Sequence, residues 1–209
     1  MYETTHFRED DLAAQHGLIE AYPLGLLISA GPDGILANPI PFVLHRGDGA
    51  RGTLRCHLAR ANAQWQALES APSALVVFQG SQGYVSPSWY ATKAETEKVV
   101  PTWNYAIVQA RGPARVIHDA AWLHANVSAI TDQHEGKRPK PWAVTDAPEP
   151  FIAAQLKGIV GIEIAIESIS GKFKASQNRP VADRVGVAEG LAAEGNAAMV
   201  ALVRERGGV

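Results

Sequence analysis

The stretch IVGIEIAIESI, residues 159–169, is the clearest strand pattern in the chain. Ile162, Ile164 and Ile166 alternate with polar positions such as Glu163. Because successive side chains of a β-strand point to opposite faces, this alternation predicts a strand with one buried and one exposed face. A strand this apolar needs partners, so the stretch predicts a sheet built with segments from earlier in the chain.

The preceding segments predict further strands that are mostly neighbours along the chain. Glycine-rich turns at residues 31–34 and 47–49 separate the first three of them, which is typical of an antiparallel meander. The strands are predicted over residues 24–30, 35–45, 53–58, 74–79 and 104–117, the last interrupted at Gly112-Pro113. Helices are predicted after residues 9–11, over 62–69, 122–134 and 150–157, and along the tail.

About six strands with helices between and after them predict a mainly β fold, a β-barrel with flanking helices. Closing a sheet into a barrel removes its exposed edges. A length of 209 residues fits one domain. We therefore expect a single domain over residues 1–209, with a helical C-terminal tail from about residue 182.

The charge and cysteine content restrict the partners and the compartment. The formal net charge is −2, so no basic field favours nucleic acid, and direct DNA binding is not expected. The single cysteine, Cys56, excludes a disulfide within the chain and suits a reducing cytoplasm. The apolar runs are far too short to span a membrane, so no membrane partner is expected.

The segment CHLARAN, residues 56–62, lies where a predicted strand ends and a predicted helix begins. Free backbone N–H groups at a helix start, with Arg60 just before it, predict a phosphate-binding turn. The alternative is an ordinary helix capped by Asn62 with a surface arginine.

The segment GKFKASQNR, residues 171–179, combines three cations with a hydroxyl and two amide side chains. Lys172 and Lys174 are two residues apart, so both point the same way if the segment is extended. Such a cluster suits a ligand with a phosphate and amide-like edges, such as a flavin. The alternative is a solvated loop after the last strand.

Two aromatic segments, YVSPSWY at residues 84–90 and VPTWNY at residues 100–105, place polar-tipped rings in one region. Such rings line pockets for planar ligands, which makes Trp103 and its neighbour Asn104 candidates for cofactor contact. These rings also exceed what one small barrel can bury. We therefore expect a homodimer whose interface includes some of them.

Neither a metal site nor a catalytic residue can be assigned from the sequence. The seven histidines form no HxH or HExxH pattern, so no metal is expected, and no GxSxG motif supports a serine hydrolase. The general base of a flavin reaction would come from His57, Tyr90 or Lys93, although flavin chemistry can proceed without one.

These segments, taken in order from MYETTHF to ADRVGV, resemble the PaiB family of FMN-binding negative transcriptional regulators over about nine-tenths of the chain. The resemblance implies a split β-barrel related to pyridoxamine-phosphate oxidases, with FMN held between two subunits. It places the phosphate and the flavin contacts on two sets of residues. The phosphate set is His57, Leu58, Ala59, Arg60 and Asn62, and the flavin set is Ser176, Gln177 and Asn178.

Three functions follow from this resemblance and from the residues. The first is an FMN-binding regulatory or redox-sensing protein. The second is a flavin-dependent oxidoreductase acting on a small-molecule substrate. The third is a haem-binding split barrel, for which His57 is the histidine inside a motif. The family name implies repression of degradative-enzyme and sporulation genes in bacteria, but a fold does not fix such a role.

Overall fold

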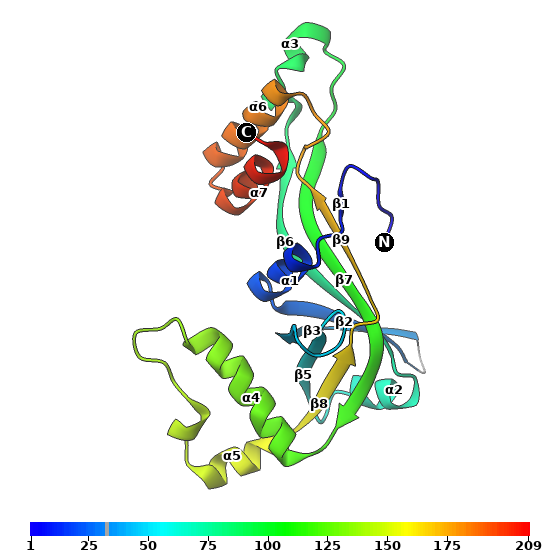
Figure 1. Ribbon diagram of the computed structural model, residues 1–209, viewed down its shortest axis with the longest axis vertical. Coiled ribbons are helices and arrows are strands. Elements are labelled where there is room, and N and C mark those ends of the chain that lie inside the picture. The colour runs from blue at the N-terminus through cyan, green and yellow to red at the C-terminus, as the bar shows by residue number, and fades with distance from the viewer. Residues whose placement is uncertain (32–33) are drawn as a thin grey trace. The chain divides into compact units, whose positions relative to one another are not determined.

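The computed structural model describes residues 1–31 and 34–209 (Figure 1). Pro32 and Asp33, the centre of the turn predicted at residues 31–34, lie outside the described residues. The chain divides into two compact units. Unit 1 comprises Met1–Leu18, Gln79–Val108 and Ser170–Val209, and unit 2 comprises Ile19–Phe78 and Gln109–Ile169.

Unit 2 is built on an antiparallel sheet with the strand order β3-β2-β6-β7-β8-β5-β4. Two of these strands, β6 and β7, are long and continue into unit 1 (Figure 1). The strands are β2 (Leu24–Gly31), β3 (Gly34–Pro41), β4 (Val43–His45), β5 (Thr53–Ala59), β6 (Ser73–Val85), β7 (Thr102–Ile117) and β8 (Ile159–Ala165).

The core of unit 2 follows from the alternation of its strands. Leu54, Cys56 and Leu58 on β5 are almost completely buried, while the residues between them are partly exposed. Phe42 and Phe78 meet edge to face in the same unit, with ring centres 5.6 Å apart. Ile162, Ile164 and Ile166 are likewise buried.

Helices cover part of the unit 2 sheet. Helix α4 (Ala120–Glu135) packs on β8, β5 and β4, and α5 (Glu149–Leu156) packs on β8. The indole of Trp122 occupies the space that a side chain at Gly161 would need, which brings α4 close to β8. Helix α2 (Gln64–Ser70) packs on β2, and a short turn of helix, η2 (Val144–Asp146), precedes α5.

In unit 1, β9 (Ser168–Lys174) pairs with β7, and β1 (Arg8–Glu9) pairs with β9. The tail forms two helices, α6 (Val181–Ala193) and α7 (Ala197–Gly207), which pack on each other. Their core residues join buried side chains of β6 and the segment that follows it. The remaining elements are α1 (Leu12–Ala21), η1 (Pro87–Trp89) and α3 (Thr92–Thr96).

The structure confirms a mainly β fold with flanking helices and corrects several boundaries. The strand predicted over residues 159–169 is two strands, because the backbone N–H groups of Ile166 and Glu167 leave the ladder and donate to Gly52 and Arg111. The strand predicted over residues 35–45 divides at Phe42, whose N–H donates to the carbonyl of Pro23. The described residues contain nine strands rather than about six.

Strand β7 also runs without interruption through Gly112-Pro113, where a break was predicted. A side chain at Gly112 would collide with the backbone carbonyl of Ala165, so glycine permits this close approach. In the described part of the chain, no helix is both long and apolar enough to cross a membrane.

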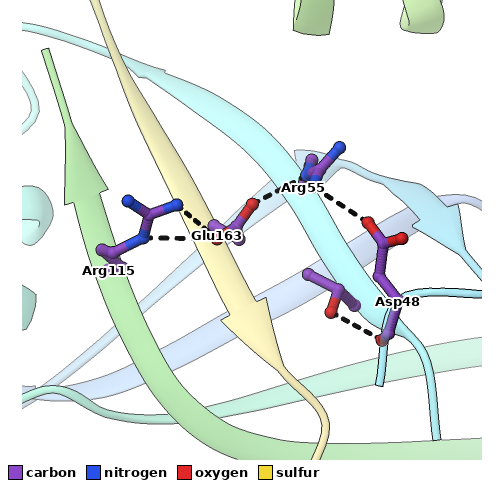
Figure 2. A network of polar contacts seen from close by, with 5 residues as sticks. Asp48, Arg55, Arg115 and Glu163 are labelled. Atoms are coloured by element: carbon purple, nitrogen blue, oxygen red, sulfur yellow. Dashed lines mark hydrogen bonds and ion pairs between the residues drawn. The ribbon is translucent and has the colours of Figure 1, made fainter. Parts of the chain in front are cut away.

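A polar network crosses three strands of unit 2 (Figure 2). Glu163 on β8 lies directly opposite Arg55 on β5 and Arg115 on β7, and it accepts hydrogen bonds from both at 2.8 and 2.7 Å. Arg55 also donates to Asp48 at 2.9 Å. Burial favours a higher pKa for Glu163, but the hydrogen bonds from the two arginines outweigh it and hold the pKa below the usual value.

We expect Glu163→Gln to lower the free energy of unfolding by about 1 kcal/mol at pH 7, the scale of a well-formed network near the surface. Because the folded-state pKa is depressed, this stabilisation is present above the unfolded-state pKa and disappears as the pH falls through the folded-state value. Urea unfolding of both proteins at pH 7 and at successively lower pH tests this. A difference between them that stays constant down to pH 3 would contradict it.

Candidate functional site

Lys172 on β9 is 91% buried, yet it is held without a carboxylate. Its Nζ donates to the carbonyl oxygen of Tyr2 at 3.1 Å. The same ammonium lies 5.3 Å from the ring centre of Tyr2 and 5.6 Å from that of Tyr105, both cation–π distances. Its side chain is only 9% exposed, so these contacts replace most of its hydration.

Lys174 is the second lysine on this face of β9. Its Nζ donates to Oγ1 of Thr102 at 2.5 Å and to the carbonyl oxygen of Trp103 at 2.6 Å. Burial lowers the pKa of Lys174, and the positive charges of Lys172 and Arg179 lower it further. A cation beside two other cations is an arrangement that favours binding of an anion.

Neutralising carboxylates are absent from this cluster. Among the described residues, Lys172, Lys174 and Arg179 form no ion pair with Asp or Glu. Arg179 instead lies over the buried ring of Tyr90, with its guanidinium carbon 4.6 Å from the ring centre. Arg179 was not among the predicted site residues, although its place in GKFKASQNR could have suggested it.

Aromatic rings adjoin the lysines. Trp103 is 50% exposed, and its Nε1 donates to Oε1 of Gln82 at 2.5 Å. The ring of Tyr84 on β6, which the sequence argument did not select individually, meets the Trp103 ring edge to face at 5.9 Å and is 43% exposed. Trp103 and Tyr105 are alternate residues of β7 and therefore share a face. We name this surface the aromatic–cationic face: Tyr84, Trp103, Tyr105, Lys172 and Lys174.

Asn104 and Ser176 lie inside unit 1 rather than on that face. Asn104 is fully buried, on the opposite side of β7 from Trp103, and its Nδ2 donates to Oγ of Ser176 at 2.9 Å. Ser176 has a φ of 61°, a left-handed conformation uncommon for a residue with a side chain. The hydrogen bond therefore holds the turn after β9 in an unfavourable backbone conformation.

Gln177 also serves this turn. Its Oε1 accepts from the N–H of Ala175 at 2.7 Å, and its Nε2 donates to the carbonyl of Phe173 at 2.6 Å. Asn178 is exposed. Of the three SQN residues, Asn178 thus has the side chain that can reach a ligand without breaking a hydrogen bond within the turn.

The tail helices hold the YVSPSWY segment. The indole of Trp89 lies against Gly190 of α6, and the backbone of Trp89 lies against Gly186, one helical turn earlier. Asp183 of the same helix is fully buried and accepts from the backbone N–H and the hydroxyl of Thr92 at 3.0 and 2.9 Å. These contacts were not predicted, because glycines spaced four apart in a helix do not reveal which side chain packs on them.

The CHLARAN residues lie in unit 2, around the end of β5. His57 is half-buried beneath α4, and its Nδ1 lies 3.3 Å from Nδ2 of Asn126. Burial lowers the pKa of His57. Leu58 is part of the core, whereas Ala59 is exposed at the strand end. The side chain of Leu58 therefore cannot contact a ligand, and any contact that Leu58 makes would be through its backbone.

Arg60 and Asn62 stabilise the turn into α2. The guanidinium of Arg60 donates to the carbonyls of Lys157 and Ile159, both at 2.9 Å, just before and at the start of β8. Oδ1 of Asn62 accepts from the N–H of Gln64 at 3.0 Å, which orders the turn before α2. The N-cap of α2 is Ala63, without a side-chain cap, so the predicted cap by Asn62 is wrong by one residue. The observed helix begins at Gln64 instead of residue 62.

The structure brings Trp103, Lys172 and Lys174 onto one face of unit 1 and the CHLARAN residues around one turn of unit 2. The donor set of unit 1 fits FMN, which combines a planar ring system with a phosphate. Exposed aromatic rings suit the former, and ammonium groups without carboxylate partners suit the latter. When bound, FMN supplies the redox chemistry, and the chain supplies binding and orientation.

Comparison with known proteins agrees with this fit. Residues 1–168 match the family described as "Putative FMN-binding domain". An uncharacterized protein of Emericella nidulans is 36% identical, with 99% of this chain and 98% of that protein covered. The protease synthase and sporulation protein PAI 2 of Bacillus subtilis is 29% identical, with 94% of this chain and 91% of that protein covered.

Solved structures show the same fold. The FAD and heme binding protein from Mycobacterium smegmatis superposes with a TM-score of 0.60 at 18% identity, with 80% of this chain and 73% of that chain covered. The predicted split β-barrel, the resemblance to the PaiB family and the predicted cofactor, FMN, are all confirmed. The chain belongs to the family of FMN-binding domains.

Proposed function

We propose that this chain is an FMN-binding homodimer with a regulatory or redox-sensing role. The observation that carries the proposal is the aromatic–cationic face of unit 1, where exposed Trp103 adjoins Lys174 and the buried Lys172. We propose two sets of cofactor-binding residues, one in each unit. They are His57, Leu58, Ala59, Arg60 and Asn62 in unit 2, and Trp103, Asn104, Lys172, Lys174, Ser176, Gln177 and Asn178 in unit 1.

A second surface supports the homodimer. Where β3, β2 and residues 74–77 of β6 pair, the register places apolar side chains on the side of the sheet opposite the buried Leu27. Leu26, for example, lies between Pro39 and Val77. We name this the apolar sheet face: Leu24, Leu26, Ile28, Ala30, Ile35, Ala37, Pro39, Pro41, Leu75 and Val77.

Such a surface is unfavourable in a monomer. Ile35 is 81% exposed and Leu24 62% exposed, and monomeric proteins rarely leave a continuous apolar patch of this kind in water. The ten residues of the face carry no charge that would select a different partner, and in a two-fold dimer the same patch of both copies would be buried. We also predict that aromatic rings of YVSPSWY or VPTWNY make contacts in that interface.

The regulatory role is supported by a relative. The similar Bacillus subtilis protein is named for protease synthesis and sporulation. To distinguish sensing from turnover, the FMN-loaded protein is mixed with excess NADH or NADPH in air. We expect no steady consumption beyond the free-flavin control. A rate of NADH or NADPH consumption that rises in proportion to protein concentration would favour the alternative function, an oxidoreductase that acts on a small-molecule substrate.

The environment of His57 does not favour haem. An axial ligand needs an imidazole nitrogen facing an open position, and His57 is half-buried beneath α4. Its Nδ1 lies beside Asn126, which leaves Nε2 as the one nitrogen that could ligate iron. The absorption spectrum of the purified protein separates the cofactors. We expect flavin bands, and a Soret band retained after haem addition and desalting would support haem.

We expect no tight, sequence-specific DNA binding by this chain alone. Helices α6 and α7 are joined by three residues, as in a helix-turn-helix, but the exposed start of α7 carries Ala197, Ala198 and Ala201. Alanine cannot hydrogen-bond to base edges. A fluorescence anisotropy titration with promoter DNA of its own operon at physiological salt measures this. Nanomolar binding that survives excess competitor DNA would support a direct repressor.

A further inference from the structure

We infer that Asn126 is a positioning residue for His57. Its amide holds the imidazole proton on Nε2, so that a neutral histidine donates a hydrogen bond to the phosphate group of FMN. The inference rests on the proposed function, in which His57 belongs to the phosphate-binding turn between β5 and α2. Asn126 lies 69 positions away from His57 and is not in the proposed set of cofactor-binding residues.

The contact between the two side chains selects one form of the imidazole. Asn126 is on α4 and only 3% exposed, and its Nδ2 lies 3.3 Å from Nδ1 of His57. An amide nitrogen can only donate, so a hydrogen bond between these atoms requires that Nδ1 carry no proton. Because a neutral imidazole has one proton, that proton is on Nε2, which becomes a hydrogen-bond donor.

The surroundings of His57 also favour the neutral imidazole. Burial beneath α4 lowers the pKa of His57. Within the described chain, no Asp or Glu forms an ion pair with His57, and the nearest charged groups on this face, Arg55 and Glu163, pair with each other. A second proton on Nδ1 would also point at the N–H group of Asn126.

Trp122, one helical turn before Asn126, limits how the His57 ring can move. Its indole fills the space above Gly161, the residue directly opposite His57 on β8. The Cβ atoms of directly opposite residues are about 4.5–5.5 Å apart, so the indole lies beside the base of the His57 side chain. Asn126 is the one hydrogen-bond partner of that side chain within residues 1–31 and 34–209, which leaves Nε2 for a ligand.

Arg60 adds a charged donor group to the same turn. A guanidinium has five N–H groups. Two of them donate to the carbonyls of Lys157 and Ile159, and a third lies 3.5 Å from Nδ1 of His118, so two stay free. A phosphate at this turn can therefore accept hydrogen bonds from a cation, Arg60, and from a neutral donor, His57.

The amide of Asn126 is poorly suited to a purely structural role. Its Oδ1 is buried and has no hydrogen-bond partner among the described residues. A buried oxygen without a partner destabilises the folded chain, whereas leucine at this position would bury no polar atom. We therefore expect Asn126→Leu to have a melting temperature equal to or above that of the wild type.

The first test locates the proton in the FMN-loaded wild type. Two-bond 15N–1H correlation NMR at about pH 7.5, above the usual pKa of an imidazole, shows which ring nitrogen is protonated. The signals that His57→Phe lacks are those of His57. We expect a proton on Nε2 and none on Nδ1. A proton on Nδ1 would contradict the inference.

Asn126→Asp tests the consequence for binding. A carboxylate only accepts, so Nδ1 takes the proton, and the new charge raises the pKa of His57. Nε2 is then protonated in the imidazolium at lower pH and bare in the neutral form at higher pH. We expect the variant to bind FMN roughly tenfold more weakly at about pH 9 than at about pH 7, the scale of one charge-assisted hydrogen bond.

Riboflavin, which lacks the phosphate, and a second variant are the controls. Gln133→Glu makes the same change from amide to carboxylate two turns further along α4. Quenching of flavin fluorescence gives the dissociation constants. We expect less than about a twofold pH effect on FMN binding by the wild type and by Gln133→Glu, and on riboflavin binding by all three proteins. An equal pH effect in all three, or an equal effect on both flavins, would contradict the inference.

Asn126→Leu decides the matter if circular dichroism shows that Asn126→Asp does not fold. Without the amide, we expect the proton of His57 to be shared between Nδ1 and Nε2 in the NMR spectrum. A proton still confined to Nε2 would contradict the role of Asn126. Wild-type protein that binds neither flavin would contradict the proposed function itself, and the position of the His57 proton can then be measured on the FMN-free protein, so the two failures stay distinct.

Discussion

Gly186→Ala is expected to lower the free energy of unfolding by about 3 kcal/mol, the upper range for overpacking. A methyl group at this position of α6 would collide with the backbone carbonyl of Trp89, which cannot move as a flexible side chain can. The expected sign opposes helix propensity, since alanine is ordinarily the better helix former by about 1 kcal/mol. Urea unfolding followed by circular dichroism measures the change.

Gly17→Ala provides the matched control. Gly17 is in α1 of the same unit, and no atom lies where its methyl group would be placed. We expect this change to stabilise the protein by about 0.5–1 kcal/mol, because glycine loses more chain entropy than alanine on folding. If both substitutions stabilise the protein, α6 does not pack on Trp89 as described.

Leu26→Asp is expected to convert the homodimer to a monomer at micromolar concentration. Leu26 is central on the apolar sheet face, between Pro39 and Val77. A two-fold interface would bury the new carboxylate twice, and an unpaired buried charge costs about 3–5 kcal/mol, which corresponds to at least a hundredfold weaker association. Sedimentation velocity measures the change.

Phe151→Asp is the control for this experiment. Phe151 lies on α5, is 54% exposed and is not part of the apolar sheet face. It receives the same chemical change, and we expect the protein to stay dimeric. A dimeric Leu26→Asp variant would show that the interface lies elsewhere, for example on the rings of YVSPSWY or VPTWNY.

The sequence was sufficient where the deciding interactions are local. The two-residue spacing of Lys172 and Lys174 predicted a common direction, and the structure places both on β9. The alternation around Glu163 predicted the buried isoleucine face. Each of these follows from strand periodicity over a few residues.

Interactions between distant segments could not be predicted in this way. The residues whose carbonyls bind the Arg60 guanidinium lie 97 and 99 positions further along the chain. The sequence around Arg60 therefore gave no sign of these hydrogen bonds. The end of β8 at Ala165 could not be predicted from the sequence either. Ile166 continues the apolar alternation, but its backbone N–H donates to the carbonyl of Gly52 instead of to a neighbouring strand of the ladder. Asn104 stays a predicted ligand contact, and its hydrogen bond to Ser176, 72 positions away, could not be foreseen from the sequence.

The central claim is that this chain binds FMN as a homodimer, and sedimentation velocity of the FMN-loaded protein tests it most directly. The boundary is followed at the visible absorption of the flavin, so only flavin-carrying species are seen. We predict that the flavin sediments as one species with twice the mass of the 22.3 kDa chain. Flavin that sediments with a single chain, or that stays behind as free FMN, would contradict the account.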